Sequence, residues 1–339
     1  MDFGFNDEQQ AIKETAREML AKRSPLDKVR EAAEARAYDD ALWAEICGLG
    51  WPGIAIPEEH GGQGLGTVEL AILCEELGYA CAPTPFLSNA SAGLLIDQAG
   101  SDEQRQRWLP GIASGEERGA AAFEHGSNDL VPDAVGAAVL VLADGDRATL
   151  VEAGDAEIEP VELVDATRHY ARVVLDSGGD PLPGDAAAAA DRSLVALAAE
   201  LTGIAQRAME MAIDYAKERQ QFDRPIGAYQ AVSHRCAGML YEVEEARSLT
   251  YYAAWCADDE PESLPLAGSM AKARASDGAW RVTNDALQVL GGIGFTWEHD
   301  LHFLLKRAKV DAELYGDARL HRERVAQLAG LGAVATAAV

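Results

Sequence analysis

The sequence is short of positive charge. Its 339 residues include 29 Lys and Arg but 56 Asp and Glu, which gives a formal net charge of −27. A surface this acidic repels nucleic-acid phosphates and anionic membranes, so we expect no nucleic-acid partner. It also repels a polyanionic cofactor, and any phosphate site must therefore be a local basic spot.

Cysteine and long apolar runs are scarce as well. The five cysteines include no Cys-x-x-Cys pair, which favours buried free thiols in a reducing cytosol over disulfides or a zinc site. No apolar run reaches the ~20 residues that a membrane-spanning helix needs. Residues 1–5 lack the basic region and apolar run of a signal peptide. We therefore expect a cytoplasmic protein without a membrane partner.

His299 and His302 have no apparent third ligand, so we expect no metal site.

Apolar residues make up 48% of the sequence, which is enough for a sizeable core. The first part of the chain also shows helical periodicity. Asn6 is expected to cap a helix over residues 6–23, and Thr67 to cap another. Further helices are expected over residues 39–49, 88–98 and 102–112. The glycine-rich stretch over residues 61–66 is flanked by helices rather than by a βαβ unit, so we interpret it as a tight loop between helices.

The pattern changes near Gly119. Short apolar runs separated by Asp, Gly and Pro indicate a meander of brief β-strands. These runs cover residues 120–123, 135–142, 148–152 and 172–175. The region spans only ~65 residues, so it can form no more than a small sheet or barrel.

The last part of the chain is helical again. A heptad stripe predicts one long helix, which we interpret as buried in its own bundle rather than in an exposed coiled coil. The stripe consists of Leu194, Leu197, Leu201, Ile204, Ala208, Met211 and Tyr215. Further helices are expected over residues 231–257, 266–290 and 299–308.

The predicted fold is therefore mainly α with a small β domain. We divide the chain into an N-terminal helical domain (1–116), a reduced middle β domain (117–184), a C-terminal four-helix bundle (185–330) and a frayed tail (331–339).

Three motifs, in this order along the chain, resemble those of acyl-CoA dehydrogenases. They are LGWPGIAIPEEHGGQG at 49–64, KERQQFDRPI at 217–226 followed by Gln230, and QVLGGIGF at 288–295. The resemblance runs from about residue 3 to residue 324 and implies that family's fold of helical, β and helical domains.

The resemblance also implies a cofactor, FAD. In the family, the second and third motifs bind the adenine and pyrophosphate half of FAD across a subunit interface. The corresponding residues are Arg219, Phe222, Gln288, Gly291 and Gly292. An arginine suits a pyrophosphate because its planar fork can donate two hydrogen bonds, and glycines allow close backbone approach. Taken alone, Arg219 could instead form a surface salt bridge with Glu218 or Asp223.

The chain departs from the family where the flavin ring is held. The family's T-E-P-x-x-G-S-D segment corresponds to FEHGSND at 123–129, with Phe123 at the Thr position and His125 at the Pro position. The later W-[IV]-[TS] segment is absent from the sequence. The groups that would hydrogen-bond the ring are therefore in doubt on this chain.

The family's catalytic base is missing too. Taking the α-proton of a thioester requires a carboxylate. The two positions that supply it in different branches of the family are occupied here by Gly316 and Ser193. Asp317 and Asp191 are displaced fallback carboxylates, each more readily interpreted as a solvated or capping acid.

Three hypotheses follow. The first is that the chain is the small subunit of an α2β2 heterotetramer. It would resemble the heterotetrameric enzymes that act on steroid side-chain acyl-CoA thioesters in steroid catabolism and lipid metabolism. It would share an FAD site with a homologous partner subunit and pass electrons to electron-transfer flavoprotein. The second is a homo-oligomeric acyl-CoA dehydrogenase that uses Asp317 or Asp191 as its base. The third is a binding or structural protein without flavin.

Overall fold

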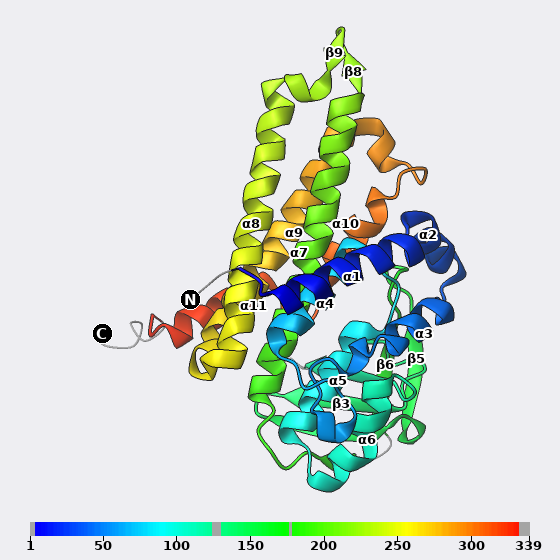
Figure 1. Ribbon diagram of the computed structural model, residues 1–339, viewed down its shortest axis with the longest axis vertical. Coiled ribbons are helices and arrows are strands. Elements are labelled where there is room, and N and C mark those ends of the chain that lie inside the picture. Colours follow the sequence, from blue (N-terminus) through cyan, green and yellow to red (C-terminus); the bar gives the residue numbers. More distant parts are fainter. Residues whose placement is uncertain (1–3, 124–129, 176–177, 332–339) are drawn as a thin grey trace, which may run out of the picture.

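The computed structural model describes residues 4–123, 130–175 and 178–331, and its elements confirm the predicted order of helices, small β region and helices. Three long helices, α7 (Ala187–Glu218), α8 (Gln230–Asp259) and α9 (Leu264–Leu290), run along the long axis of the molecule (Figure 1). The strands lie towards one end of this axis, beside α5 and α6, and a short hairpin forms the other end. None of the described helices has the length and apolar content needed to cross a membrane.

Local sequence signals account for much of the N-terminal domain. Its helices are α1 (Asp7–Arg23), α2 (Leu26–Ala35), α3 (Asp40–Gly48), α4 (Thr67–Tyr79), α5 (Phe86–Ala99) and α6 (Asp102–Ser114), with short 3₁₀ turns at Trp51–Gly53 and Glu58–His60. Asn6 caps α1 as predicted, in a reciprocal capping box with Gln9. Helix α2 was not predicted from the sequence. The prediction that the glycine-rich stretch is a loop between helical elements is confirmed.

The β region forms two small sheets. One has the strand order β1-β3-β4-β7 and the other β2-β6-β5. The strands are β1 (Gly119–Phe123), β2 (Val131–Pro132), β3 (Val139–Asp144), β4 (Arg147–Glu152), β5 (Ala156–Val161), β6 (Tyr170–Leu175) and β7 (Asp180–Pro181). Strands β1, β3, β4 and β6 match the predicted runs, although β3 begins at Val139 rather than at residue 135. Strands β2, β5 and β7 were not predicted.

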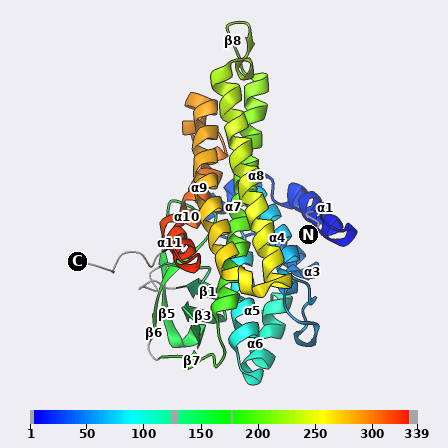
Figure 2. The same cartoon turned by 90° about the vertical axis from the view of Figure 1, so that its left-hand side faces the viewer.

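The C-terminal helices bury the predicted stripe. Leu194, Leu197, Leu201, Ile204 and Ala208 are all buried, and α7 packs against α4, α8 and α9. The fourth bundle helix, α10 (Leu301–Glu313), ends later than expected, and a further helix, α11 (Ala318–Leu328), packs on α9 beside it (Figure 2). The interpretation of the stripe as a face buried within the bundle is therefore confirmed. Helix α11 is an additional helix packed on the bundle.

The start of α4 differs from the prediction. Gly66, not Thr67, is the N-cap, and the missing side-chain acceptor comes from the end of α8. Both carboxylate oxygens of Asp258 accept backbone N–H bonds, from Thr67 at 2.8 Å and from Val68 at 3.0 Å. A residue 190 positions away therefore caps α4 and joins the N-terminal domain to the bundle.

We expect Asp258→Ala to lower the free energy of unfolding by about 1 kcal/mol, the usual cost of losing an N-cap acceptor. Urea denaturation followed by circular dichroism measures this change. Asp259→Ala is the matched control, because Asp259 is an equally exposed acid at the end of the same helix. Equal effects of the two substitutions would show that the cap does not stabilise the protein.

Candidate functional site

The second motif forms the corner between α7 and α8. Helix α7 ends at Glu218, and the two-stranded hairpin of β8 (Gln220–Gln221) and β9 (Arg224–Pro225) follows. Phe222 and Asp223 form its tip with φ values of 52° and 61°, as a tight two-residue hairpin turn requires. Tyr229 fixes the hairpin to the start of α8, because its hydroxyl donates to the carbonyl of Gln221 at 3.0 Å.

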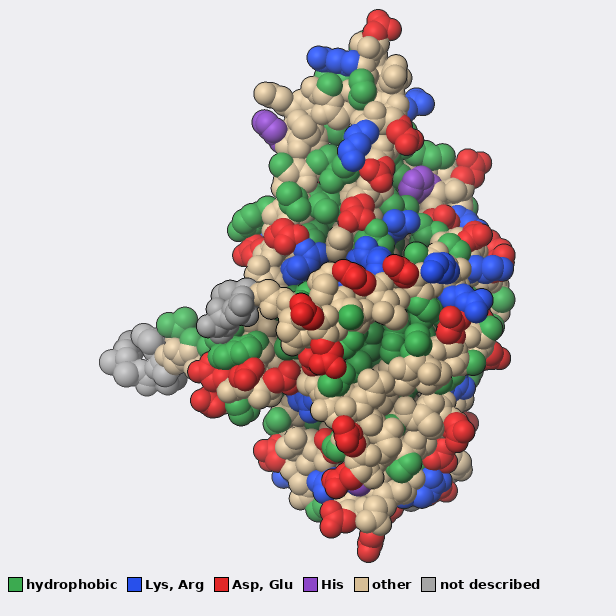
Figure 3. Space-filling view, viewed as in Figure 1, with side chains coloured by type: hydrophobic (Ala, Val, Ile, Leu, Met, Phe, Trp, Pro, Cys, Tyr) green, Lys and Arg blue, Asp and Glu red, His purple; other side chains and the backbone are tan. Residues whose placement is uncertain are grey.

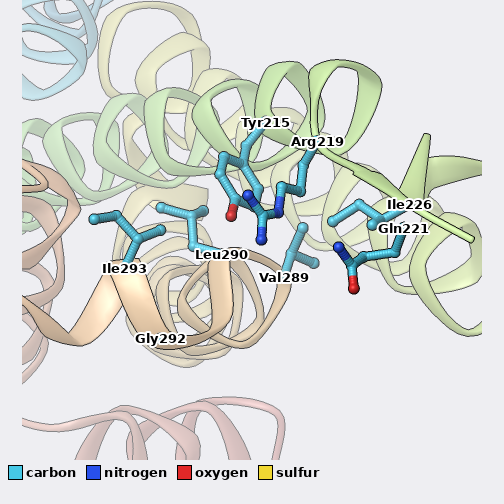
Figure 4. A pocket seen from close by; sticks show the side chains of 8 residues that line it. All are labelled: Tyr215, Arg219, Gln221, Ile226, Val289, Leu290, Gly292 and Ile293. Atoms are coloured by element: carbon cyan, nitrogen blue, oxygen red, sulfur yellow. The ribbon is translucent and has the colours of Figure 1, made fainter. Parts of the chain in front are cut away.

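A cavity of about 570 Å³ lies beside this corner, between α7 and the end of α9 (Figure 4). Arg219 points from α7 into the gap between the two segments, and Gly292 lies on the turn opposite it. The full lining is Tyr215, Arg219, Gln221, Ile226, Val289, Leu290, Gly292 and Ile293. The cavity therefore combines one guanidinium and one amide with largely apolar walls.

The side chain of Arg219 has no acidic partner. Across residues 4–123, 130–175 and 178–331, no ion pair within 4.0 Å involves Arg219. The alternative of a salt bridge with Glu218 or Asp223 is therefore not observed. In a chain of net charge −27, this guanidinium is the kind of local basic spot that an anionic ligand requires.

The glycines of the third motif leave room for a ligand. Gly291 ends α9 with φ of 63°, and its N–H donates to the carbonyl of Leu287. A Cβ atom placed on Gly291 or Gly292 would meet nothing within 4 Å. A phosphate-bearing ligand can therefore approach the backbone here without a steric barrier.

The structure brings together only some of the predicted site residues. Arg219 and Gly292 line the same cavity, with Gly291 next to them. Phe222 lies at the hairpin tip with 87% of its surface exposed, and Gln288 is also exposed; neither of them lines the cavity. Gln221 lines it and was not predicted. Its position two residues after Arg219, on a strand, was the available signal.

The two family base positions hold no acid. The backbone at Gly316 has φ of 96°, and a Cβ there would lie 3.0 Å from Leu320, so a side chain at this position would be strained. Its carbonyl accepts from Lys272 Nζ at 2.9 Å. Burial lowers the pKa of Lys272 to about 7. Ser193 is buried, and its hydroxyl donates to the carbonyl of Ala189 at 2.9 Å.

The fallback carboxylates already have partners. Asp317 caps α11, accepting from the N–H of Leu320 at 2.7 Å. Asp191 is buried and accepts two hydrogen bonds from the guanidinium of Arg324, one of them at 2.9 Å. Both acids line a cavity of about 970 Å³ between the β3–β4 turn, α7 and α11. Each of the two carboxylates therefore already accepts hydrogen bonds from another part of the chain.

An aromatic pair separates this larger cavity from a neighbouring one. Phe123, at the end of β1, packs edge-on against Tyr315 with ring centroids 4.4 Å apart. Both residues line the 970 Å³ cavity and an adjoining cavity of about 550 Å³. The remainder of the degenerate segment, residues 124–129, lies outside the described residues.

Below these cavities, five charged side chains form a buried cluster. Arg168 bonds Glu200 at 2.7 Å and Asp311 at 2.6 Å, and Arg307 bonds Glu200 at 2.8 Å and Asp165 at 2.7 Å. All five are at most 5% exposed. Burial raises the pKa of Asp311 to about 7. The cluster joins the β5–β6 connection to α7 and α10, and so fixes the β region on the bundle.

Among the described residues, no group of three or more His, Cys, Asp or Glu could hold a metal ion.

Comparisons with known proteins agree with this architecture. Residues 6–116 match the model for the acyl-CoA dehydrogenase N-terminal domain, and residues 186–329 match the model for the acyl-CoA dehydrogenase C-terminal domain. The chain is 33% identical over 325 residues to acyl-CoA dehydrogenase IpdE2 of Mycolicibacterium smegmatis, covering 95% of this chain and 98% of that protein.

Solved structures are similar over nearly the whole chain. A Tcur3481-Tcur3483 steroid ACAD variant shares 29% identity with a TM-score of 0.86, covering 96% of this chain and 99% of that one. A chain of the ChsE4-ChsE5 complex from Mycobacterium tuberculosis has a TM-score of 0.90 over 98% of this chain and 100% of that one. Its 23% identity makes that likeness one of fold.

Proposed function

Because the chain belongs to the acyl-CoA dehydrogenase family, we propose that it is one subunit of an FAD-dependent enzyme that introduces an α,β double bond into an acyl-CoA thioester. In this proposal the chain contributes the adenine and pyrophosphate half of a shared FAD site. A homologous partner subunit, in a heterotetramer, supplies the flavin-ring site and the base.

The observation that carries the proposal is the contrast between Arg219 and the acids. The guanidinium of Arg219 faces a cavity and has no acidic partner among the described residues, whereas Asp191 and Asp317 are each hydrogen-bonded to another group. The chain thus offers a guanidinium to an anion, while its two candidate bases are already hydrogen-bonded. That is the division expected of a subunit that completes a cofactor site in another chain.

The residues of the cavity suit the cofactor that the family implies. Arg219 would hold the pyrophosphate with two donors, and the unobstructed backbone at Gly291 and Gly292 would lie against it. Gln221 would donate its amide, and Ile226 and Leu290 would flank the adenosine. When bound, FAD supplies the acceptor for the hydride that leaves the β-carbon. Within this proposal, Phe222 and Gln288 remain exposed for contact with the partner subunit.

Two finer points belong to the same proposal. The substrate is a steroid side-chain acyl-CoA thioester, a proposal supported by the similarity to the Tcur3481-Tcur3483 steroid ACAD. Electrons pass to electron-transfer flavoprotein, the family's usual acceptor. We place this reaction in the cytoplasm. Neither point is needed for the division of labour between subunits.

The test is to produce the chain alone and together with an acyl-CoA dehydrogenase homologue sought among its neighbouring genes. We expect the lone chain to carry little FAD, and the co-purified complex to carry FAD and to be bleached by an acyl-CoA thioester. Asp317→Asn in the complex should leave bleaching unchanged. Stoichiometric FAD and activity in the lone chain, lost in Asp317→Asn or Asp191→Asn, would instead establish a homomeric enzyme. A colourless complex would support a protein without flavin.

A further inference from the structure

A separate cavity of about 260 Å³ lies on the N-terminal side of the molecule. The end of α1, the start of α2, the end of α4 and the middle of α7 enclose it. It shares no lining residue with the Arg219 cavity. Its lining is Arg17, Leu20, Ala21, Ser24, Pro25, Leu26, Glu76, Tyr79, Ala80 and Arg207.

One polar atom in this lining lacks a partner. The hydroxyl of Ser24 is buried, with the residue 4% exposed, and it makes no hydrogen bond. Its own backbone N–H is engaged with the carbonyl of Leu20, so only the side chain is left over. A buried hydroxyl without a partner is costly, and a polar ligand in the adjoining cavity would relieve that cost.

Two guanidiniums approach the same aromatic ring. The guanidinium carbons of Arg17 and Arg207 lie 3.5 Å and 5.2 Å from the ring centroid of Tyr79. Arg17 is paired with Glu76. Arg207 contacts only the hydroxyl of Tyr79, at 3.3 Å, and no carboxylate within 4.0 Å of it occurs in the part of the chain that the structure describes.

Two acids lie near Arg207, and each already accepts hydrogen bonds from other side chains. Both oxygens of Glu76 are bonded by Arg17. Glu210 accepts from the hydroxyl of Tyr79 and, at 2.8 Å, from the amide of Gln206. Arg17 and Arg207 are thus balanced by Glu76 and Glu210 around the cavity, and the feature that suits an anion is the guanidinium of Arg207, which has no carboxylate within 4.0 Å among the described residues. Figure 3 shows Lys and Arg side chains gathered across the middle of the molecule on the face that carries α1.

We propose that this cavity binds a small carboxylate with a short apolar tail. The carboxylate would accept from Arg207 and from the hydroxyl of Ser24. The tail would lie against Leu20, Leu26 and Ala80. The volume is below that of a drug-sized site, which typically begins at about 300 Å³. The proposal concerns only this cavity and does not depend on the flavin proposal.

The test is a titration of the full chain, in its complex where one co-purifies, at constant ionic strength by calorimetry. Sodium butyrate is the probe, with butanol and inorganic phosphate as comparison ligands. We expect saturable binding of butyrate that Arg207→Gln weakens about tenfold or more, as loss of a charge-assisted bond does. Ser24→Ala should weaken it less and should not lower the melting temperature of the free protein, since the hydroxyl has no partner to lose.

Arg23→Gln is the matched control, because Arg23 precedes Ser24 on α1 but pairs with Glu45 and does not line the cavity. Arg207→Lys covers the possibility that the Gln variant misfolds, and it should weaken butyrate binding while retaining the charge. The proposal is overturned if butyrate does not saturate, if butanol or phosphate binds equally well, or if Arg23→Gln weakens binding as much as Arg207→Gln.

Discussion

Arg307→Met is expected to lower the free energy of unfolding by about 3–5 kcal/mol, the range measured when one member of a buried ion pair is removed. Arg307 is 1% exposed and bonds three groups: Asp165 at 2.7 Å, Glu200 at 2.8 Å and the hydroxyl of Thr167 at 2.6 Å. Methionine fills similar space but leaves Asp165 buried without its cation. The cost is therefore desolvation of an unpaired carboxylate rather than lost packing.

Urea denaturation followed by circular dichroism measures this loss. Arg281→Met is the control, since Arg281 is 55% exposed in its side chain and pairs with Glu242 and Asp277 at 3.4 and 3.6 Å. An exposed pair of this kind contributes about 0–1 kcal/mol. Limited proteolysis adds a second readout, because Arg307→Met should speed cleavage between β5 and β6. A loss below that of Arg281→Met would show that the cluster does not hold the β region on the bundle.

The same cluster shows which parts of the fold the sequence could not predict. Its members come from the β5–β6 connection, α7 and α10, and their sequence separations reach 143 residues. Each looks like an ordinary surface charge in its own segment. Only the three-dimensional packing brings them together, and no local pattern records that packing. The cap of α4 by Asp258 was missed for the same reason.

Local sequence signals predicted the features that depend only on neighbouring residues. Asn6 and Gln9 lie three residues apart, so the capping box of α1 can be read from a single turn. The stripe on α7 was interpretable because burial on one face repeats with the helix. By contrast, β5 alternates in exposure but carries Glu157 and Glu159 on its exposed side, and pairing with β6 defines it as a strand. Short strands of this kind depend on partners rather than on propensity.

The candidate site was predictable to the same extent. The motif that contains Arg219 identified the corner, because an arginine at a helix end beside a Pro-Gly turn is a local feature. The role of Gln221 depends on how the hairpin folds back towards α9, and the exposure of Phe222 depends on the tight turn at the tip. The engagement of Asp191 by Arg324 depends on contact between α7 and α11. The sequence could therefore locate the corner that we propose as the anion site, but it could not show that Asp191 and Asp317 already have hydrogen-bond partners.

Arg219→Gln is expected to weaken FAD binding by the co-purified complex about 10–100-fold, because hydrogen bonds to charged groups contribute about 1.5–3 kcal/mol. Glutamine keeps a donor amide but lacks the charge and the two parallel donors of arginine. The loss of FAD affinity therefore reports the pyrophosphate contact itself. Flavin fluorescence, which rises as FAD dissociates, measures the change across a dilution series. Melting temperature should fall little, since Arg219 makes no side-chain ion pair with the described residues.

Arg224→Gln is the matched control for this measurement. Arg224 lies on the other strand of the same hairpin, stacks 4.0 Å from the ring of Tyr229 and does not line the cavity. Both substitutions remove one positive charge from the same corner, so any general electrostatic effect on a polyanionic cofactor is common to the two. A difference of tenfold or more isolates direct contact by Arg219. Equal weakening would mean that the corner attracts FAD only through its charge, and unchanged binding in both would place the cofactor elsewhere.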